Sequence, residues 1–109
     1  MNAGKLLVAT RDDDICGYAS ILTMVANDDA PDEIDYTYAY VQDLGVSESF
    51  RGSGIGSQLL EACEQVARRI GARWLQLDVL SDNTQAVKFY EKHALRPVYV
   101  RMEKALDEQ

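Results

Sequence analysis

The first half of the chain alternates apolar and polar positions in the way that β-strands do. Valine, isoleucine, threonine and tyrosine are frequent there, and such β-branched and aromatic side chains favour extended structure. Tyr36, Tyr38 and Tyr40 occupy every second position, so their rings share one face of a strand. Residues 27–33, which include Pro31, are typical of a loop. We therefore expect an antiparallel meander of three strands, at residues 5–10, 15–26 and 35–46.

A helical period begins after the third strand. Glu64 and Arg68 are four positions apart, in the order that favours a surface ion pair. Gly71 can end a helix in the left-handed conformation. Apolar residues recur three or four positions apart, as on one face of an amphipathic helix, at Ile55, Leu59, Ala62, Cys63, Val66 and Ile70.

Strand and helix patterns then alternate to the end of the chain. Residues 74–80 alternate as a strand does, and Asn83 is placed to cap a second helix over residues 84–93. Residues 97–106 return to alternation, with Val98, Val100 and Met102 on one face. The element order is therefore β-β-β-α-β-α-β, which predicts an α/β chain with a mixed sheet.

Length and composition limit the class of protein. The 109 residues suit one domain, 1–109, and a hydrophobic share of 47% suits a packed globule. No apolar run is long enough for a transmembrane helix, and the first residues lack a signal-peptide pattern, so we expect a cytoplasmic protein without a membrane partner. Cys16 and Cys63 have no metal-ligand spacing; we expect reduced packing residues and no metal, with a disulfide or a reactive thiol as the alternative.

The charge disfavours one class of partner. Eleven basic and 18 acidic residues give a net charge of −7, which disfavours nucleic acid because that binding rests on clustered positive charge. The acidic residues gather in two groups, either solvated turns or a surface that attracts a cationic amine. These groups are Asp12 to Asp14, and Asp28, Asp29, Asp32, Glu33 and Asp35.

The candidate chemistry lies in a glycine-rich loop, Arg-Gly-Ser-Gly-Ile-Gly at residues 51–56. Glycines keep side chains away, so that backbone N–H groups can converge on an anion. The N-terminus of the following helix adds partial positive charge, and Arg51 adds a full charge. Together they suit a pyrophosphate.

Three interpretations of this loop compete. The first is a flexible turn. The second is a Rossmann dinucleotide site, with Asp78 as its acidic residue, although Ser57 stands where the third glycine belongs and antiparallel strands precede the loop. A Walker P-loop is excluded because no Gly-Lys-Ser/Thr follows.

The third interpretation is a resemblance to a family. Residues 43–60 resemble motif A of the GCN5-related N-acetyltransferase (GNAT) family, whose signature Arg/Gln-x-x-Gly-x-Gly/Ala is met by Arg51, Gly54 and Gly56. Residues 77–91 resemble motif B, and the spacing of the motifs and the β/α order agree. The family usually has a further strand and two helices first, so this chain resembles an N-terminally abbreviated member. It also has Ala94-Leu95 where Gly-Phe is usual.

The resemblance implies an acyltransferase that moves the acetyl group of acetyl-CoA to a primary amine, on a small molecule or a peptide, by direct attack in a ternary complex. Pantetheine would lie between the strand that ends at residue 46 and the strand after residue 73. Tyr90 would protonate the leaving thiolate. By the same resemblance, the cofactor would be held by Leu44, Gly45, Val46, Arg51, Gly52, Ser53, Gly54, Ile55, Gly56, Ser57, Asn83 and Tyr90.

Ordinary structural roles compete with these assignments. Tyr90 could be a core aromatic residue, Asn83 a helix cap, and His93 a partner of the helix dipole. The three tyrosines of the third strand could be packing residues or could line an acceptor site. Asp43, Tyr38 and Glu33 are equal candidates for a general base acting through water.

The abbreviated N-terminus leaves the activity open between two alternatives. One is a complete enzyme; the other is a catalytically incompetent CoA-binding module, or a fragment that needs a partner chain. The first strand would be an unpaired edge with apolar content. We therefore expect a homodimer.

Overall fold

The computed structural model describes residues 3–26 and 37–107. By its internal contacts the chain forms two units, residues 1–78 and residues 79–109, which are described here one at a time. The loop predicted at residues 27–33 lies outside the described residues, as do Tyr36 and the second acidic group, Asp28, Asp29, Asp32, Glu33 and Asp35.

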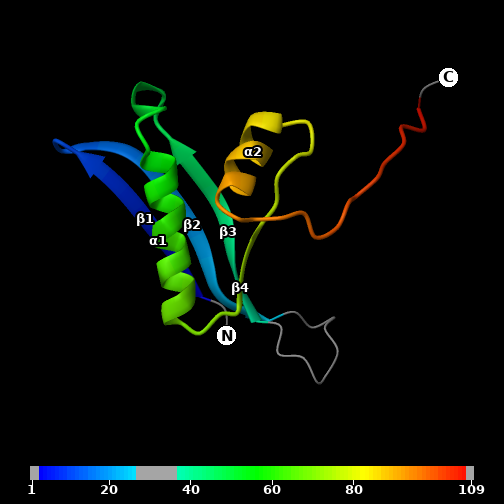
Figure 1. The fold of residues 1–109 in the computed structure, drawn as a ribbon, viewed down its shortest axis with the longest axis horizontal. Helices are drawn as coiled ribbons and strands as arrows, with labels where there is room; N and C mark the ends of the chain where they lie inside the picture. The colour runs from blue at the N-terminus through cyan, green and yellow to red at the C-terminus, as the bar shows by residue number, and fades with distance from the viewer. Residues whose placement is uncertain (1–2, 27–36, 108–109) are drawn as a thin grey trace. The chain divides into compact units, whose positions relative to one another are not determined.

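The first unit contains a four-stranded mixed sheet in the order β1-β2-β3-β4 (Figure 1). The first two pairings are antiparallel and the third is parallel, which confirms the predicted meander and the mixed sheet. A parallel neighbour requires a crossover connection, and the helix between β3 and β4 provides it. The strands are β1, Ala3–Arg11; β2, Asp14–Ala26; β3, Thr37–Val46; and β4, Trp74–Leu77.

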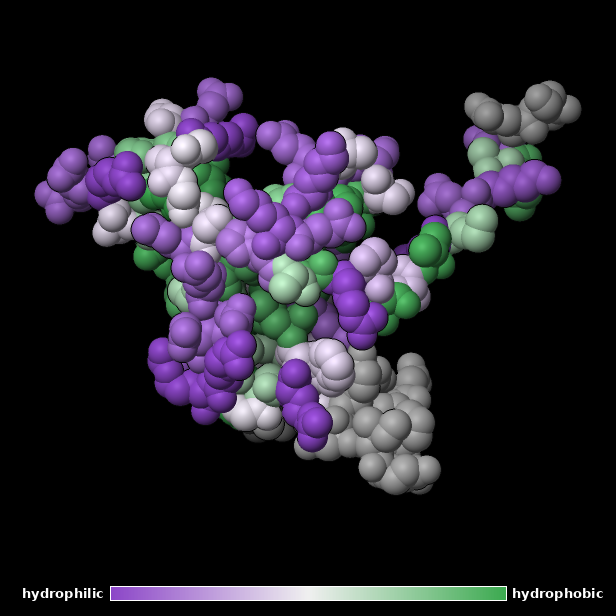
Figure 2. All heavy atoms as spheres, in the orientation of Figure 1, coloured by the Kyte–Doolittle hydropathy of each residue, from purple (hydrophilic) through white to green (hydrophobic). Residues whose placement is uncertain are grey.

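Helix α1, Ile55–Arg69, covers one face of this sheet (Figure 1). Its apolar stripe is buried against small and branched residues of the strands, so the core lies between α1 and the sheet. Hydrophilic side chains cover the outward side of the helix (Figure 2). Cys16 and Cys63 are both free and fully buried in this core, which confirms the prediction of reduced packing residues.

Two surface predictions for α1 are also confirmed. Arg68 donates to the Glu64 carboxylate at 2.7 Å, four residues apart on the exposed face. Gly71 follows the C-cap with a φ of 84°, the left-handed conformation that glycine adopts without strain.

A bulge in β3 changes which side chains point to α1. Ser20 pairs with Asp43 but Ile21 pairs with Val41, so Gln42 is the extra residue. Before the bulge, Ala39 and Val41 are buried in the core under α1; after it, Leu44 and Val46 pack there. Asp43 and Gly45 therefore point to the opposite face, as does Tyr18, the cross-strand partner of Gly45.

The second unit contains helix α2, Thr84–Lys92. Asn83 is its N-cap, and the Asn83 side chain accepts a hydrogen bond from the Ala86 N–H at 3.2 Å, as expected of a cap. His93 is the C-cap residue. Among the described residues, none of the helices has the length and apolarity needed to cross a bilayer.

The strand predicted at residues 97–106 is wrong. This segment has no regular structure, and Val98, Val100 and Met102 are 65%, 79% and 88% exposed; Figure 2 shows hydrophobic residues along it in green. An alternating sequence becomes a strand only when a neighbouring strand satisfies its backbone groups. No such pairing exists for this segment in the described part of the chain, so the element order ends at α2.

Candidate functional site

The glycine-rich loop starts where β3 ends, and hydrogen bonds hold its backbone in a defined conformation. The Ser47 N–H donates to the Cys16 carbonyl of β2 at 2.8 Å, and the Phe50 N–H donates back to the Ser47 carbonyl at 2.9 Å. Between them lies a short 3₁₀ turn, η1, Glu48–Phe50. The Ser53 hydroxyl donates to the Phe50 carbonyl. These bonds fix the path of the chain between β3 and α1, which disfavours the interpretation of a flexible turn.

Two glycines in the loop adopt conformations that other residues avoid. Gly52 and Gly54 have φ values of 82° and 87°, in the left-handed region where a Cβ is strained. A Cβ added at either position would meet nothing within 4 Å. The backbone conformation, and not crowding, therefore requires glycine here, and the loop surface beside these residues is open.

Gly54 is the N-cap of α1, and no side chain caps the helix there. Ile55, the first helical residue, is 3% exposed and anchors the helix to the core, while Gly56 and Ser57 are half-buried in the first turn. A helix leaves the N–H groups of its first turn without intrahelical partners and concentrates positive potential at that end. The sequence therefore folds into an arrangement that suits a bound anion.

Arg51 connects the loop to the end of β3. Its Nε donates to the Val46 carbonyl at 3.3 Å, and its side chain is otherwise exposed. This bond holds a positive charge between the strand end and the start of α1. Arg51 thus lies among the residues that the sequence assigned to anion binding.

The end of β3 is separated from β4. Among the described residues, β3 pairs with β4 only from Tyr38 to Val41, opposite Trp74 to Leu77. Residues 42–46 continue beyond the last paired position, and they remain paired to β2 through Leu44, Gly45 and Val46. The side of β3 that faces β4 therefore has backbone groups outside the ladder at the residues predicted to bind pantetheine.

Gly45 is required by its cross-strand neighbour. A Cβ at Gly45 would lie 2.8 Å from Cε1 of Tyr18 and 3.3 Å from Cζ, because the Tyr18 ring lies over the glycine. The Tyr18 hydroxyl then donates to Asp43 Oδ2 at 2.8 Å. This hydrogen bond and the negative carboxylate raise the pKa of Tyr18 above its usual 10.0.

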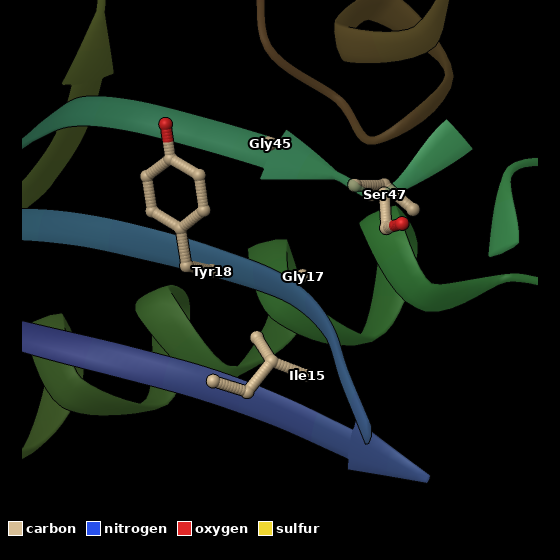
Figure 3. Close-up of a pocket in the computed structure, with 6 residues that line it drawn as sticks. Ile15, Gly17, Tyr18, Gly45 and Ser47 are labelled. Atoms are coloured by element: carbon tan, nitrogen blue, oxygen red, sulfur yellow. The ribbon is translucent and has the colours of Figure 1, made fainter. Parts of the chain in front are cut away.

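A shallow pocket of about 280 Å³ lies beside the Tyr18 ring (Figure 3). The sequence interpretation included Gly45 and Val46 but missed the lining residues from β2. These residues could have been found only from the strand register, because Tyr18 pairs with Gly45 and Gly17 pairs with Val46 across the two strands. The lining residues are Ile15, Gly17, Tyr18, Gly45, Val46 and Ser47.

A second tyrosine–aspartate pair joins β3 to the residue after β4. The Tyr40 hydroxyl donates to Asp78 Oδ2 at 2.6 Å. Tyr38 and Tyr40 are both half-buried, which agrees with the interpretation of strand packing. Asp78, the acidic residue of the Rossmann interpretation, accepts a hydrogen bond from a tyrosine of the sheet.

Asn83 and Tyr90, the remaining predicted site residues, belong to the second unit. Tyr90 is half-buried on α2, and its ring meets the Phe89 ring edge-on, at 5.2 Å between centroids and 66° between planes. The Phe89 ring in turn lies 4.9 Å from the His93 ring. The structure thus brings together the predicted residues of β3, the loop and α1 within the first unit, while the roles of Asn83 and Tyr90 toward a cofactor stay predictions.

Comparison with known proteins agrees with this geometry. A family model described as the acetyltransferase (GNAT) family matches residues 1–94. Over 68 residues the chain is 40% identical to the uncharacterized N-acetyltransferase YycN of Bacillus subtilis, and over 66 residues it is 36% identical to the aminoalkylphosphonate N-acetyltransferase of Salmonella typhimurium. These matches cover 62% and 61% of this chain, but only 44% and 43% of the two relatives.

Solved structures agree as well. A mutant of the BH1408 protein from Bacillus halodurans superposes with a TM-score of 0.86 at 29% identity, over 94% of this chain and 66% of that chain. The family match spans the β3–loop–α1 segment and all of α2. The fold, the loop and the family match lead to one conclusion: this chain belongs to the GNAT family of acetyltransferases.

Proposed function

We propose that this protein is an N-acetyltransferase that moves the acetyl group of acetyl-CoA to a primary amine by direct attack in a ternary complex. Membership of the GNAT family supports the reaction class. The observation that carries the proposal is the arrangement at the end of β3, where an unpaired strand side meets a left-handed glycine loop and an uncapped helix N-terminus. The alternative is a CoA-binding module, or a fragment that needs a partner chain, without catalytic competence.

The loop fits the pyrophosphate of acetyl-CoA. The backbone N–H groups of residues 52–57 would face it, since no Cβ stands beside Gly52 or Gly54 and the helix end attracts negative charge. Arg51, fixed to the Val46 carbonyl, would supply a charge-assisted contact. The buried side chain of Ile55 would hold the N-terminus of α1 in place.

The open side of β3 fits the amides of the pantetheine arm. Backbone groups of Leu44 and Val46 would pair with them, as a neighbouring strand would, because β4 ends before these residues. Gly45, between them, keeps that stretch of backbone free of a side chain on the Tyr18 face. Asn83 would hydrogen-bond the same arm.

Acetyl-CoA would supply a thioester that an amine nitrogen can attack. The nitrogen must be neutral, whereas a free alkylammonium has a pKa of about 10, so the site must accept a proton through water. An N–H group near Val46 would stabilise the developing oxyanion. Tyr90 would donate its phenolic proton to the departing sulfur. The C–N bond forms first, and the C–S bond breaks as the carbonyl re-forms and CoA leaves.

Calorimetric titration with acetyl-CoA, with NAD as the control ligand, tests the cofactor. We expect acetyl-CoA alone to bind, and Arg51→Ala to weaken it by roughly five- to tenfold through the lost phosphate contact. Arg69→Ala is the matched control, because Arg69 is an exposed arginine in the last turn of α1. If NAD binds as tightly as acetyl-CoA, or if the two variants weaken acetyl-CoA binding equally, the proposed pyrophosphate site at the loop is contradicted.

Turnover separates the enzyme from the binding module. Release of free CoA thiol with a primary amine, absent without the amine, would show acetyl transfer, and Tyr90→Phe should then lower kcat more than it changes KM. Acetyl-CoA binding with no CoA release from any amine would favour the module.

We also propose a homodimer and a cytosolic location. β1 is the outer strand of the sheet, and Leu6 and Val8 on it are 66% and 48% exposed, so its edge is suited to pair with a second copy. The two buried free cysteines agree with a reducing compartment. Light scattering that gives one chain mass at high concentration would reject the dimer.

A further inference from the structure

We propose that the pocket beside Tyr18 binds the amine acceptor, and that it selects a small primary amine that carries its positive charge next to a short apolar or aromatic arm. This rests on the proposed acetyl transfer and adds the class of acceptor. The pocket has about 280 Å³, which is at the lower end of small-molecule sites.

The shape of the pocket suits an apolar arm. Ile15 contributes a branched side chain and Tyr18 an aromatic ring, and both side chains are exposed. Gly17 and Gly45 contribute only backbone, and a Cβ at Gly45 would lie 2.8 Å from the Tyr18 ring. In Figure 3 the Tyr18 ring extends over β3 and the Ile15 side chain lies over β1, and both residues line the pocket. Gly45 therefore keeps open the space beside the Tyr18 ring.

The charge beside the pocket suits a cation. The face of the Tyr18 ring attracts a positive charge through its quadrupole, and the Asp43 carboxylate lies 2.8 Å from the Tyr18 hydroxyl. In the described part of the chain no cationic side chain forms an ion pair with Asp43. An ammonium group near Tyr18 would therefore find both an aromatic face and an anion.

Two basic side chains, Arg51 and Arg11, make contacts with residues other than Tyr18 and Asp43. Arg51 donates to the Val46 carbonyl, and the Arg11 guanidinium lies 5.8 Å from the centre of the Phe50 ring. Phe50 packs against the core under α1, on the other side of the sheet from Tyr18. An acceptor with a phosphonate or carboxylate arm would place that anion near Asp43 with no cation to offset the repulsion.

The pocket also lies next to the proposed chemistry. Val46 lines it, and the same residue is proposed to hold the acetyl end on the side of β3 that faces β4. An amine bound against Tyr18 would therefore lie beside the strand residue that is proposed to hold the acetyl end. Tyr18 is in this sense a specificity-determining residue.

Binding of the amine can be tested without turnover. Two-dimensional amide NMR would be recorded during titration with phenethylamine, with 3-phenylpropionate as the anion of similar shape and 2-aminoethylphosphonate as the amine with an anionic arm. We expect saturable shifts at Gly17, Gly45 and Ser47 with phenethylamine, and binding of the other two at least fivefold weaker. Equal or tighter binding of either anion, or shifts spread evenly over the protein, would overturn the inference.

Matched variants test the residues. Asp43→Asn should weaken phenethylamine binding by roughly three- to tenfold, as expected for one partly exposed charge, and Tyr18→Leu should weaken it similarly. Glu61→Gln, which removes an exposed carboxylate on α1, is the control and should change nothing. If Asp43→Asn behaves like Glu61→Gln while its amide spectrum stays native, the pocket does not select cations.

The outcomes distinguish this inference from the proposed function. If acetyl-CoA fails to bind but phenethylamine binds beside Tyr18, acetyl transfer is wrong and the amine pocket stands. If acetyl-CoA is turned over but kcat/KM is highest for 2-aminoethylphosphonate and unchanged in Asp43→Asn, acetyl transfer stands and the amine pocket is wrong.

Discussion

Replacing Gly17 by alanine places a methyl group where the fold has no room for it. The added Cβ would lie 2.9 Å from Leu59 Cδ1, 3.0 Å from the Gly45 carbonyl oxygen and 3.1 Å from Ile55 Cγ2. Leu59 and Ile55 are 4% and 3% exposed in the core under α1, and the Gly45 oxygen belongs to the backbone, so none of the three can move aside cheaply. Overpacking of a core costs about 1–3 kcal/mol. We expect Gly17→Ala to lie near the upper end of that range.

Two other glycines of the same sheet provide the comparison. At Gly4 the nearest atoms to an added Cβ are 3.8 Å away, an ordinary contact, and alanine in a strand is favoured over glycine by roughly 0.5–1 kcal/mol; Gly4→Ala should therefore leave stability unchanged or raise it slightly. At Gly45 the Cβ meets the Tyr18 ring at 2.8 Å, but that ring can rotate away at the surface. The cost of Gly45→Ala should fall between the other two.

Urea unfolding followed by the fluorescence of Trp74, the single tryptophan, measures the three effects. Small proteins lose about 1–3 kcal/mol of stability per molar urea, so Gly17→Ala should lower the midpoint by roughly 1 M or more. Far-ultraviolet circular dichroism should give the same midpoints if the transition is two-state. A Gly17→Ala midpoint that coincides with that of Gly4→Ala would refute the argument that Gly17 is required by the contact of β2 with α1.

Three further predictions concern individual groups. Burial raises the pKa of the Cys63 thiol above its usual 9.0, so iodoacetamide at pH 8.5 should modify it far more slowly in the native protein than in urea; equal rates would contradict its burial. The pKa of Tyr18 is raised mainly by its hydrogen bond to Asp43, so absorbance titration of Asp43→Asn should show one tyrosine that ionises at lower pH than in the parent. Because the folded pKa of Tyr18 exceeds its unfolded value of 10.0, its contribution to stability is complete below pH 10 and is lost as the pH rises through the folded pKa. If the free energy of unfolding falls with rising pH in the same way in Asp43→Asn as in the parent, this reasoning is contradicted. Asn83→Ala removes the cap bond to the Ala86 N–H and should destabilise α2 by about 1 kcal/mol, visible as faster amide exchange in its first turn, while Asn83→Asp should keep the cap.

Local patterns predicted most of the fold. The period of two in the first half, the helical period from Ile55 and the glycine after that helix each act over a few residues, and each is found in the structure. The loop between β3 and α1 was also predictable, since Gly52 and Gly54 are the residue type that their φ values require. What local patterns could not supply was the cross-strand neighbour of each residue.

Register explains what the sequence missed in the site. Tyr18 and Gly45 are 27 positions apart, and nothing local to either reveals that the ring of one covers the other. Their pairing depends on the extra residue Gln42, since a bulge shifts every partner that follows it. The failure of the strand predicted at residues 97–106 has the same origin, because alternation indicates a suitable side-chain pattern but not a neighbouring strand.

The bulge at Gln42 also lets the end of β3 contribute residues to both proposed sites, the cofactor site and the amine pocket. If Gln42 were a regular strand position instead of a bulge, alternation from Ala39 and Val41 would turn Asp43 and Gly45 toward α1 and would expose Leu44 and Val46 on the other face. A carboxylate would then enter the core, and the wall beside Tyr18 would lose both its glycine and its anion. With the bulge, apolar Leu44 and Val46 stabilise the core, while the opposite face keeps Gly45 under the Tyr18 ring and Asp43 at its hydroxyl. The same few residues therefore hold Arg51 of the glycine-rich loop through the Val46 carbonyl and shape the proposed amine pocket through Gly45, so the proposed cofactor and acceptor sites share the end of β3.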